Sequence, residues 1–295
     1  MPEIIASDGL PARDNGTWAK EKLSFLDEFG PRALLATKRK RERHFVDLFA
    51  GPGLNKDRRT GEEFPGSSIR AIKMRASADE STAFTHAVMV NVDPEDHDAL
   101  RERVRRVVAS GESRVPPTNI RYINGDANFV LPRVLDGINK RAYAFVLADI
   151  ERPEHWPWSS MAELRSHGHE SIGFAVLFPL DMAINRLISY DKDATAANAD
   201  ALTRFYGTEE WSRIADRRIT DAQSPELRRE LQELYMSRMR ALGWEVVRIV
   251  RDVRFRGDHR LYKLIFATDH EAGANIAGWE GKHHEKQRDQ LGLDL

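Results

Sequence analysis

The chain has 295 residues, of which 41% are hydrophobic, so it is long enough for one large domain with an ample core. Lysine and arginine number 45 against 46 aspartates and glutamates, a balance that gives no global field attracting nucleic acid or a membrane. The absence of cysteine excludes disulfides, thiolate metal sites and cysteine nucleophiles. With neither a signal-peptide pattern nor an apolar run of roughly 18 residues, we expect a soluble, cytoplasmic protein with no membrane partner.

One helix and then a series of strands are expected in the first two thirds of the chain. Trp18, Phe25 and Phe29 mark the helix, and the charged run at residues 38–43 is typical of a solvated connection. Short β-rich runs follow at residues 45–49, 87–92, 120–124, 143–148 and 173–178, with helical spacing between them. These runs are apolar throughout, as in parallel strands covered by helices on both faces, which predicts a doubly wound α/β fold.

The end of the chain departs from this alternation. An amphipathic segment at residues 225–242 precedes two β-rich runs, 244–255 and 261–268, which are joined by "RGDH" and predict a hairpin. Five parallel strands, a helix and a terminal hairpin form the order of elements in class I S-adenosylmethionine methyltransferases, whose last strand inserts antiparallel. We therefore predict a doubly wound, mostly parallel seven-stranded sheet of that type with a C-terminal β-hairpin.

Two regions are expected along the chain. Residues 1–43 form an N-terminal helical lead-in, and residues 44–295 form the methyltransferase-like α/β domain. Within that domain, a segment at about 190–242 is expected to act as a helical cap or substrate segment.

The first strand ends in "HFVDLFAGPG", at the sheet edge where doubly wound folds bind ligands. Gly51 and Gly53 would let a ligand touch backbone, although glycines also serve ordinary tight turns. Asp47 near the strand end is expected to organise the loop or to hold the ammonium group of S-adenosylmethionine, directly or through water. Phe49 belongs to the same predicted cofactor site.

The second and third strands also end in polar residues. Asn91 and Asp93 follow the second strand, where a ribose-binding acid is expected. Asp126, Ala127 and Asn128 follow the third, where they would hydrogen bond an adenine amine and ring nitrogen. Helix capping by Asp93 and Asp126 is the alternative. Because three successive strand ends carry such groups, we favour cofactor binding.

Several blocks together resemble the three-Cys-motif partner proteins. The blocks are "HFVDLFAGPG", "GSSIRAI", "VDPEDHDAL", "GDAN", "LFPLDMAINR", "LTRFYG" with Trp211 after it, and "LYKLIFATDHEAG". The likeness extends from about Trp18 to about Ile276. Proteins of that family take their name from radical enzymes with three cysteines that are encoded beside them. The resemblance implies a methyltransferase-like fold and leaves the substrate largely open.

Two positions depart from that family's pattern. Asn91 stands where the ribose acid is usual, so it can bond a hydroxyl but brings no charge. After the fourth strand the family generally has Asp-Pro followed closely by Gly, whereas this chain reads "FVLADIERPEHWPW" and keeps only Asp149. The reacting group is normally held there, so the chemistry of this chain can differ.

The same segment supplies the candidate catalytic residues. Asp149 and Glu151 would project near the cofactor mouth, with His155, Trp156 and Trp158 close behind, and paired carboxylates could orient an amine or remove a proton. In the alternative interpretation Asp149 caps a turn, Glu151 faces water and the tryptophans pack on the sheet.

Residues after the fifth strand are candidates for substrate binding. Asn185 and Arg186 could bind a polar or anionic substrate, although Arg186 could instead pair with an acid. The histidines at residues 167–169 and 283–284 lack the spacing of a helical zinc site, so we expect no metal.

These patterns favour a methyltransferase-like enzyme that uses S-adenosylmethionine, with an unknown acceptor. A non-methyl-transfer reaction, such as an intramolecular displacement or cyclisation, stays open, as does a non-catalytic partner protein. Small-molecule and nucleic-acid substrates are both possible at this point, and so is a protein partner.

Overall fold

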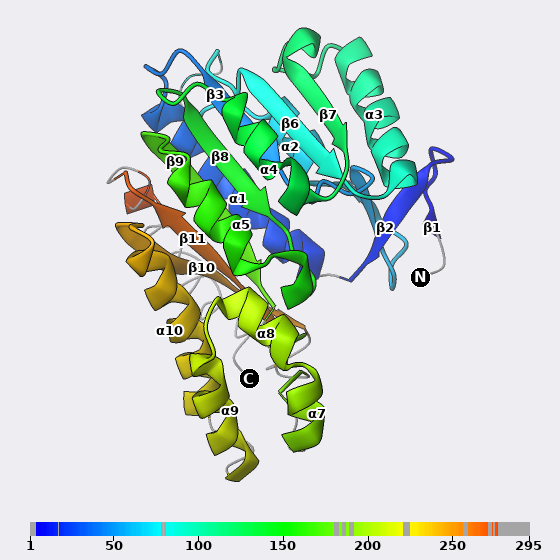
Figure 1. Cartoon of the computed structure of the whole chain (residues 1–295). Helices are drawn as coiled ribbons and strands as arrows, with labels where there is room; N and C mark the ends of the chain where they lie inside the picture. Colours follow the sequence, from blue (N-terminus) through cyan, green and yellow to red (C-terminus); the bar gives the residue numbers. More distant parts are fainter. Residues whose placement is uncertain are drawn as a thin grey trace, which may run out of the picture.

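The computed structural model describes residues 4–16, 18–77, 79, 81–179, 183–184, 187–188, 192–220, 225–255, 259–270, 273 and 275–276. Within these residues the strands form one seven-stranded and one four-stranded sheet (Figure 1). No described helix combines the length and the apolar composition needed to cross a bilayer.

The large sheet has the strand order β7-β6-β3-β8-β9-β11-β10. Its strands are β3 (Arg43–Asp47), β6 (His86–Asn91), β7 (Ile120–Asn124), β8 (Tyr143–Ala148), β9 (Ser171–Phe178), β10 (Val246–Phe255) and β11 (His259–Thr268). The first five pair in parallel, while β11 pairs antiparallel with both β9 and β10. This order, with β11 inserted antiparallel, confirms the predicted class I methyltransferase fold and its C-terminal hairpin. Residues 256–258 of the hairpin connection lie outside the described residues.

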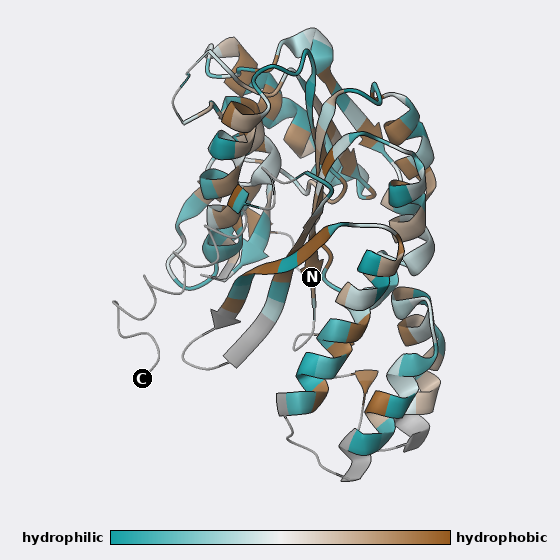
Figure 2. Ribbon diagram, turned by 90° about the vertical axis from the view of Figure 1, so that its left-hand side faces the viewer, coloured by the Kyte–Doolittle hydropathy of each residue, from teal (hydrophilic) through white to brown (hydrophobic). Residues whose placement is uncertain are grey.

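Helices cover both faces of this sheet. They are α1 (Trp18–Ala36), α2 (Ser67–Lys73), α3 (Pro94–Ala109), α4 (Ala127–Asp136), α5 (Trp158–Ser166) and α10 (Pro225–Ala241). Figure 1 shows α4 and α5 in front of the sheet and α1 behind it. Every residue of β8 and β9 is buried, because both faces are covered, and this explains their unbroken apolar runs. In Figure 2 the strands accordingly carry much of the brown, hydrophobic colour.

The smaller sheet was not predicted from the sequence. It consists of β1 (Ile4–Ile5), β2 (Pro11–Asn15), β4 (Leu54–Asp57) and β5 (Glu63–Pro65), so strands precede α1 within the segment expected to be helical. The pairing of β2 with β4 is parallel. It joins the N-terminal segment to the residues that follow the turn at Gly51, Pro52 and Gly53, called the glycine turn below.

A buried arginine fixes the small sheet against the large one. Arg103 of α3 is 5% exposed, and its guanidinium donates to both carboxylate oxygens of Asp8 at 2.8 Å. It also donates to the carbonyl oxygens of Pro11 (2.6 Å) and Pro52 (2.7 Å). One charged side chain therefore holds the start of β2 and the glycine turn together.

A helical group projects beyond the sheet at the lower end of Figure 1. It comprises α7 (Lys192–Ala197), α8 (Ala199–Tyr206), α9 (Glu210–Thr220) and α10, within the segment expected to form a cap. Aromatic rings join it to the sheet, since Phe205 and Tyr235 stack at 4.8 Å and Phe178 of β9 lies 5.1 Å from Tyr235. Two short 3-10 helices, η1 (Pro117–Asn119) and η2 (Pro153–His155), occur in connections.

Candidate functional site

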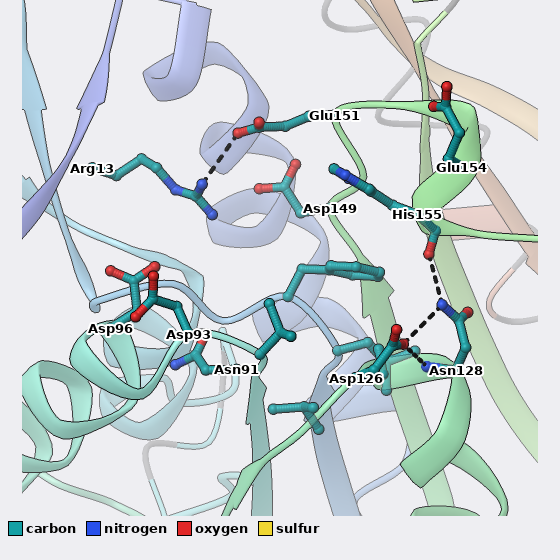
Figure 3. A pocket seen from close by; sticks show the side chains of 15 residues that line it. Arg13, Asn91, Asp93, Asp96, Asp126, Asn128, Asp149, Glu151, Glu154 and His155 are labelled. Atoms are coloured by element: carbon teal, nitrogen blue, oxygen red, sulfur yellow. Dashed lines mark hydrogen bonds and ion pairs between the residues drawn. The ribbon is translucent and has the colours of Figure 1, made fainter. Parts of the chain in front are cut away.

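A cleft of about 340 Å³ opens at the carboxyl edge of the parallel strands (Figure 3). Its walls come from the last residues of β6 and from the segments that follow β3, β6, β7 and β8, together with one residue of β2. Doubly wound folds bind ligands at this edge, and the volume lies within the range of small-molecule sites.

Most of the predicted site residues meet in this cleft. Those that line it are Phe49, Asn91, Asp93, Asp126, Ala127, Asn128, Asp149 and Glu151. Gly51 and Gly53 line a smaller adjoining cavity, which shares Phe49, Asp149 and Glu151 with the cleft. Asp47 lines neither cavity, and Asn185 and Arg186 lie outside the described residues.

Backbone conformation and packing explain why glycine occupies positions 51 and 53. Gly51 and Gly53 have φ values of 61° and 82°, in the left-handed region that favours glycine. A Cβ atom added to Gly53 would lie 2.7 Å from Cδ1 of Leu100 and 3.3 Å from Cγ1 of Ile69. Glycine at this position is therefore needed for packing inside the protein, in addition to any ligand contact.

Asp47 does not line the cleft and instead contacts the start of α2. It is fully buried, and its Oδ2 accepts hydrogen bonds from the hydroxyls of Ser67 (2.6 Å) and Ser68 (2.8 Å) at the start of α2. Burial raises the pKa of Asp47 to about 6, although the two serine hydroxyls oppose this shift. Of its two expected roles, these contacts correspond to organising the loop.

Asn91 fastens the glycine turn from the neighbouring strand. Its buried amide group donates from Nδ2 to the carbonyl oxygen of Gly51 at 2.9 Å. The side chain also lines the cleft, where its Oδ1 can accept from a ligand hydroxyl.

The two aspartates of the cleft cap helices. Asp93 accepts from the N–H of Glu95 at 2.8 Å, and Asp126 accepts from the N–H of Asn128 at 2.8 Å. Asp93 and Asp126 therefore cap helices, as the alternative interpretation of the sequence expected. Both bonds use Oδ1, so Oδ2 of each carboxylate can accept from a ligand while the cap is kept.

Asn128 links two walls of the cleft. Its Nδ2 donates to Oδ1 of Asp126 (2.9 Å) and to the carbonyl oxygen of His155 (3.1 Å), as Figure 3 shows. Its Oδ1 accepts from the hydroxyl of Ser160 at 2.7 Å. These bonds engage the Asn128 side chain in holding α4 against the segment after β8. Asp126 and the N–H of Ala127 are therefore better placed than Asn128 to hydrogen bond the expected adenine base.

Two cations reach the site from the N-terminal elements and were missed by sequence reasoning. Arg13 of β2 lies 3.2 Å from Oε1 of Glu151, and Lys22 of α1 forms an ion pair with Asp149. The Asp149 side chain is 21% exposed and that of Glu151 is 45% exposed. Nothing local to Arg13 or Lys22 signals this role, because each is more than a hundred residues from its partner.

The rest of the lining adds negative charge and one aromatic wall. Asp96 and Glu154 face the same cleft, and burial raises the pKa of Asp96. His155 also lines the cleft and stacks on Phe49 with ring centroids 6.5 Å apart. Trp156 is instead fully buried against Phe174 of β9, as the packing alternative for the tryptophans expects.

No protein-family model matches the sequence, and no curated protein matches it either. Several solved structures are similar. A protein from Legionella pneumophila shares 12% identity at a TM-score of 0.44 over 81% of both chains. Spermidine synthase from Thermotoga maritima shares 8% identity at a TM-score of 0.42, over 91% of this chain and 65% of the synthase chain. The methyltransferase domain of METTL16 shares 10% identity at a TM-score of 0.37, over 91% of this chain and 87% of that domain's chain. Likeness this low adds no argument, and the fold rests on the strand order described above.

Proposed function

We propose that the chain is an S-adenosylmethionine-dependent methyltransferase whose cofactor binds in the cleft. The observation that carries this proposal is the position of the cleft in the fold. Its polar groups follow consecutive strand ends of a class I methyltransferase sheet, in the order in which ribose and adenine contacts are expected.

The lining residues fit the nucleoside part of this cofactor. Asn91 Oδ1 and Asp93 Oδ2 would accept hydrogen bonds from the ribose hydroxyls. Asp126 Oδ2 would accept from the adenine amine, and the N–H of Ala127 would donate to a ring nitrogen. Ala127 is the first residue of α4, where backbone N–H groups have no acceptor within the helix.

The ion pairs fit the amino-acid part. A zwitterion needs a cation for its carboxylate and an anion for its ammonium group, and both occur beside the glycine turn. Arg13 and Lys22 would bind the carboxylate, while Asp149 and Glu151 would bind the ammonium group or the substrate. When bound, S-adenosylmethionine supplies an electrophilic methyl group.

The chain itself would contribute positioning and proton transfer. The walls of the cleft would hold the acceptor in line, which is a main source of rate in such a reaction. Asp149 or Glu151 would take the proton that an amine or hydroxyl acceptor releases. The carboxylates of the lining favour a small cationic or neutral acceptor, because phosphate groups of a nucleic acid would be repelled.

We also propose that the chain is related to the three-Cys-motif partner proteins, on the strength of the sequence blocks quoted above. The altered segment after β8 keeps two alternatives open, a different reaction at the same site and a non-catalytic partner role.

Calorimetric titration with S-adenosylmethionine and with its demethylated product tests the proposal. Asp126→Ser keeps a helix cap but removes the second carboxylate oxygen, so helix stability should be retained. Affinity should fall at least tenfold, about 1.4 kcal/mol. Asp136→Ser, at the other end of α4 with a 77% exposed side chain, is the matched control and should bind normally. Absence of heat and of thermal stabilisation at millimolar ligand would refute cofactor binding.

A further inference from the structure

Three potential metal ligands meet at the amino-terminal edge of the large sheet, opposite the cleft. His44 of β3 and His86 of β6 are register partners in a parallel pair, so their side chains are neighbours. Glu42 precedes β3, and its carbonyl oxygen accepts from the N–H of Tyr143 at 3.0 Å, which fixes it beside β8.

The side chains of the three residues converge. Nε2 of His44 lies 3.1 Å from Oε2 of Glu42, and the rings of His44 and His86 stack with centroids 4.3 Å apart. One ligand atom from each residue lies within 4.8 Å of the other two. His44 is buried, whereas Glu42 and His86 are partly exposed, so an ion from solvent can reach the group.

A hydrogen bond orients the ring of His86. The hydroxyl of Thr85 lies 2.9 Å from Nδ1 of His86 and can accept from it while donating to the carbonyl oxygen of Arg43 at 3.1 Å. With the proton on Nδ1, the lone pair of Nε2 is available for coordination. Metal-binding histidines characteristically donate their second ring nitrogen in this way.

The local electrostatics suit a cation. Two stacked imidazoles beside one carboxylate offer two neutral donors and one negative charge. A divalent ion would be held by all three.

We propose that Glu42, His44 and His86 bind one divalent transition metal of the zinc type. Two imidazoles with a carboxylate form a known zinc donor set that leaves a fourth position for water, whereas calcium and magnesium prefer oxygen ligands. Zinc at about 2.0–2.1 Å from its ligands sets them roughly 3.4 Å apart, so modest shifts of the three side chains complete the site. The ion would cross-link β3 and β6 at an edge separate from the proposed methyl transfer.

The test uses the untagged full chain, stripped with EDTA and dialysed. Titration with Co²⁺, followed by visible absorption, should show one ion per chain that Zn²⁺ displaces. Glu42→Gln and His86→Asn should each weaken Co²⁺ binding at least tenfold and abolish the rise in thermal midpoint that the metal causes in the parent. Circular dichroism checks that both variants fold, and Glu42→Gln changes a partly exposed side chain.

Two controls locate the site. His97→Asn in α3 removes a histidine outside the cluster, and the double variant His283→Ala and His284→Ala removes the adjacent pair near the end of the sequence. Both should bind Co²⁺ like the parent. The proposal is overturned if the parent binds no ion, if Glu42→Gln binds normally, or if the double variant loses binding. None of these readouts requires S-adenosylmethionine, so they are independent of the proposed function.

Discussion

Asp47→Asn is expected to remove a pH dependence of stability that the parent carries. The asparagine has nearly the same shape, and its Oδ1 can accept from Ser67 and Ser68 as Oδ2 of the carboxylate does. Its amide nitrogen takes the place of the second carboxylate oxygen, at a cost that does not depend on pH. What changes is the charge, which is buried completely in the parent. Because burial disfavours the ionised form, replacing it by a neutral amide removes a destabilising term.

The raised pKa sets the size of this effect. The pKa of Asp47 moves from 3.8 to about 6 on folding, which corresponds to about 3 kcal/mol at pH values above both. The unfolded chain loses this proton at lower pH than the folded chain, so stability falls as pH rises from about 4 to about 6 and then stays level. At pH 5 the loss is about 1.6 kcal/mol, so the stability of the variant relative to the parent should rise by about 1.4 kcal/mol between pH 5 and pH 7.5.

Urea unfolding of parent and variant at pH 5 and pH 7.5 measures that difference. Asp98→Asn changes a side chain that is 76% exposed and is the control. Its difference from the parent in free energy of unfolding should be the same at the two pH values. If the free energies of unfolding of Asp47→Asn and the parent differ by the same amount at both pH values, Asp47 does not titrate as burial requires.

Two further changes probe the turn and the catalytic candidates. Gly53→Ala should lower the free energy of unfolding by about 1–3 kcal/mol, because it adds a side chain at positive φ against Leu100; equal urea midpoints would contradict this. Asp149→Asn and Glu151→Gln should each reduce turnover of the true substrate roughly 10²-fold or more at saturating cofactor. Steady-state rates equal to the parent would remove both residues from catalysis.

The large sheet could be predicted because its strands are covered on both faces. A strand such as β8 is buried at every position, and six consecutive nonpolar or aromatic residues record this in the sequence. The predicted first strand began two residues late and extended through Phe49, whereas β3 ends at Asp47. The apolar pair Leu48 and Phe49 belongs to the turn, where Phe49 lines the cleft.

The small sheet could not be predicted in the same way. Its strands have two to five residues, and β2 reads "PARDN", with every position only partly buried. Such a segment has no apolar face for periodicity to detect. Its pairing with β4 and its attachment through Arg103 are contacts between distant parts of the chain.

The same reasoning explains which site residues were found. Asp93 and Asp126 directly follow strands, and their position in the sequence therefore gives their place at the sheet edge. The sequence alone does not bring the proposed metal ligands together, because Glu42 and His44 meet His86 only through strand pairing.

The ion pairs bear on where the functional unit of this protein begins. Glu151 and Asp149 follow β8, and each is paired with a cation from the segment before β3. Arg13 and Lys22 both lie within residues 1–43, the region expected to be only a lead-in. That region therefore supplies the positive charge that balances the carboxylates nearest the glycine turn. Arg13 lines the cleft and Lys22 lines the adjoining cavity, so the N-terminal segment is part of the proposed site rather than an attachment to it.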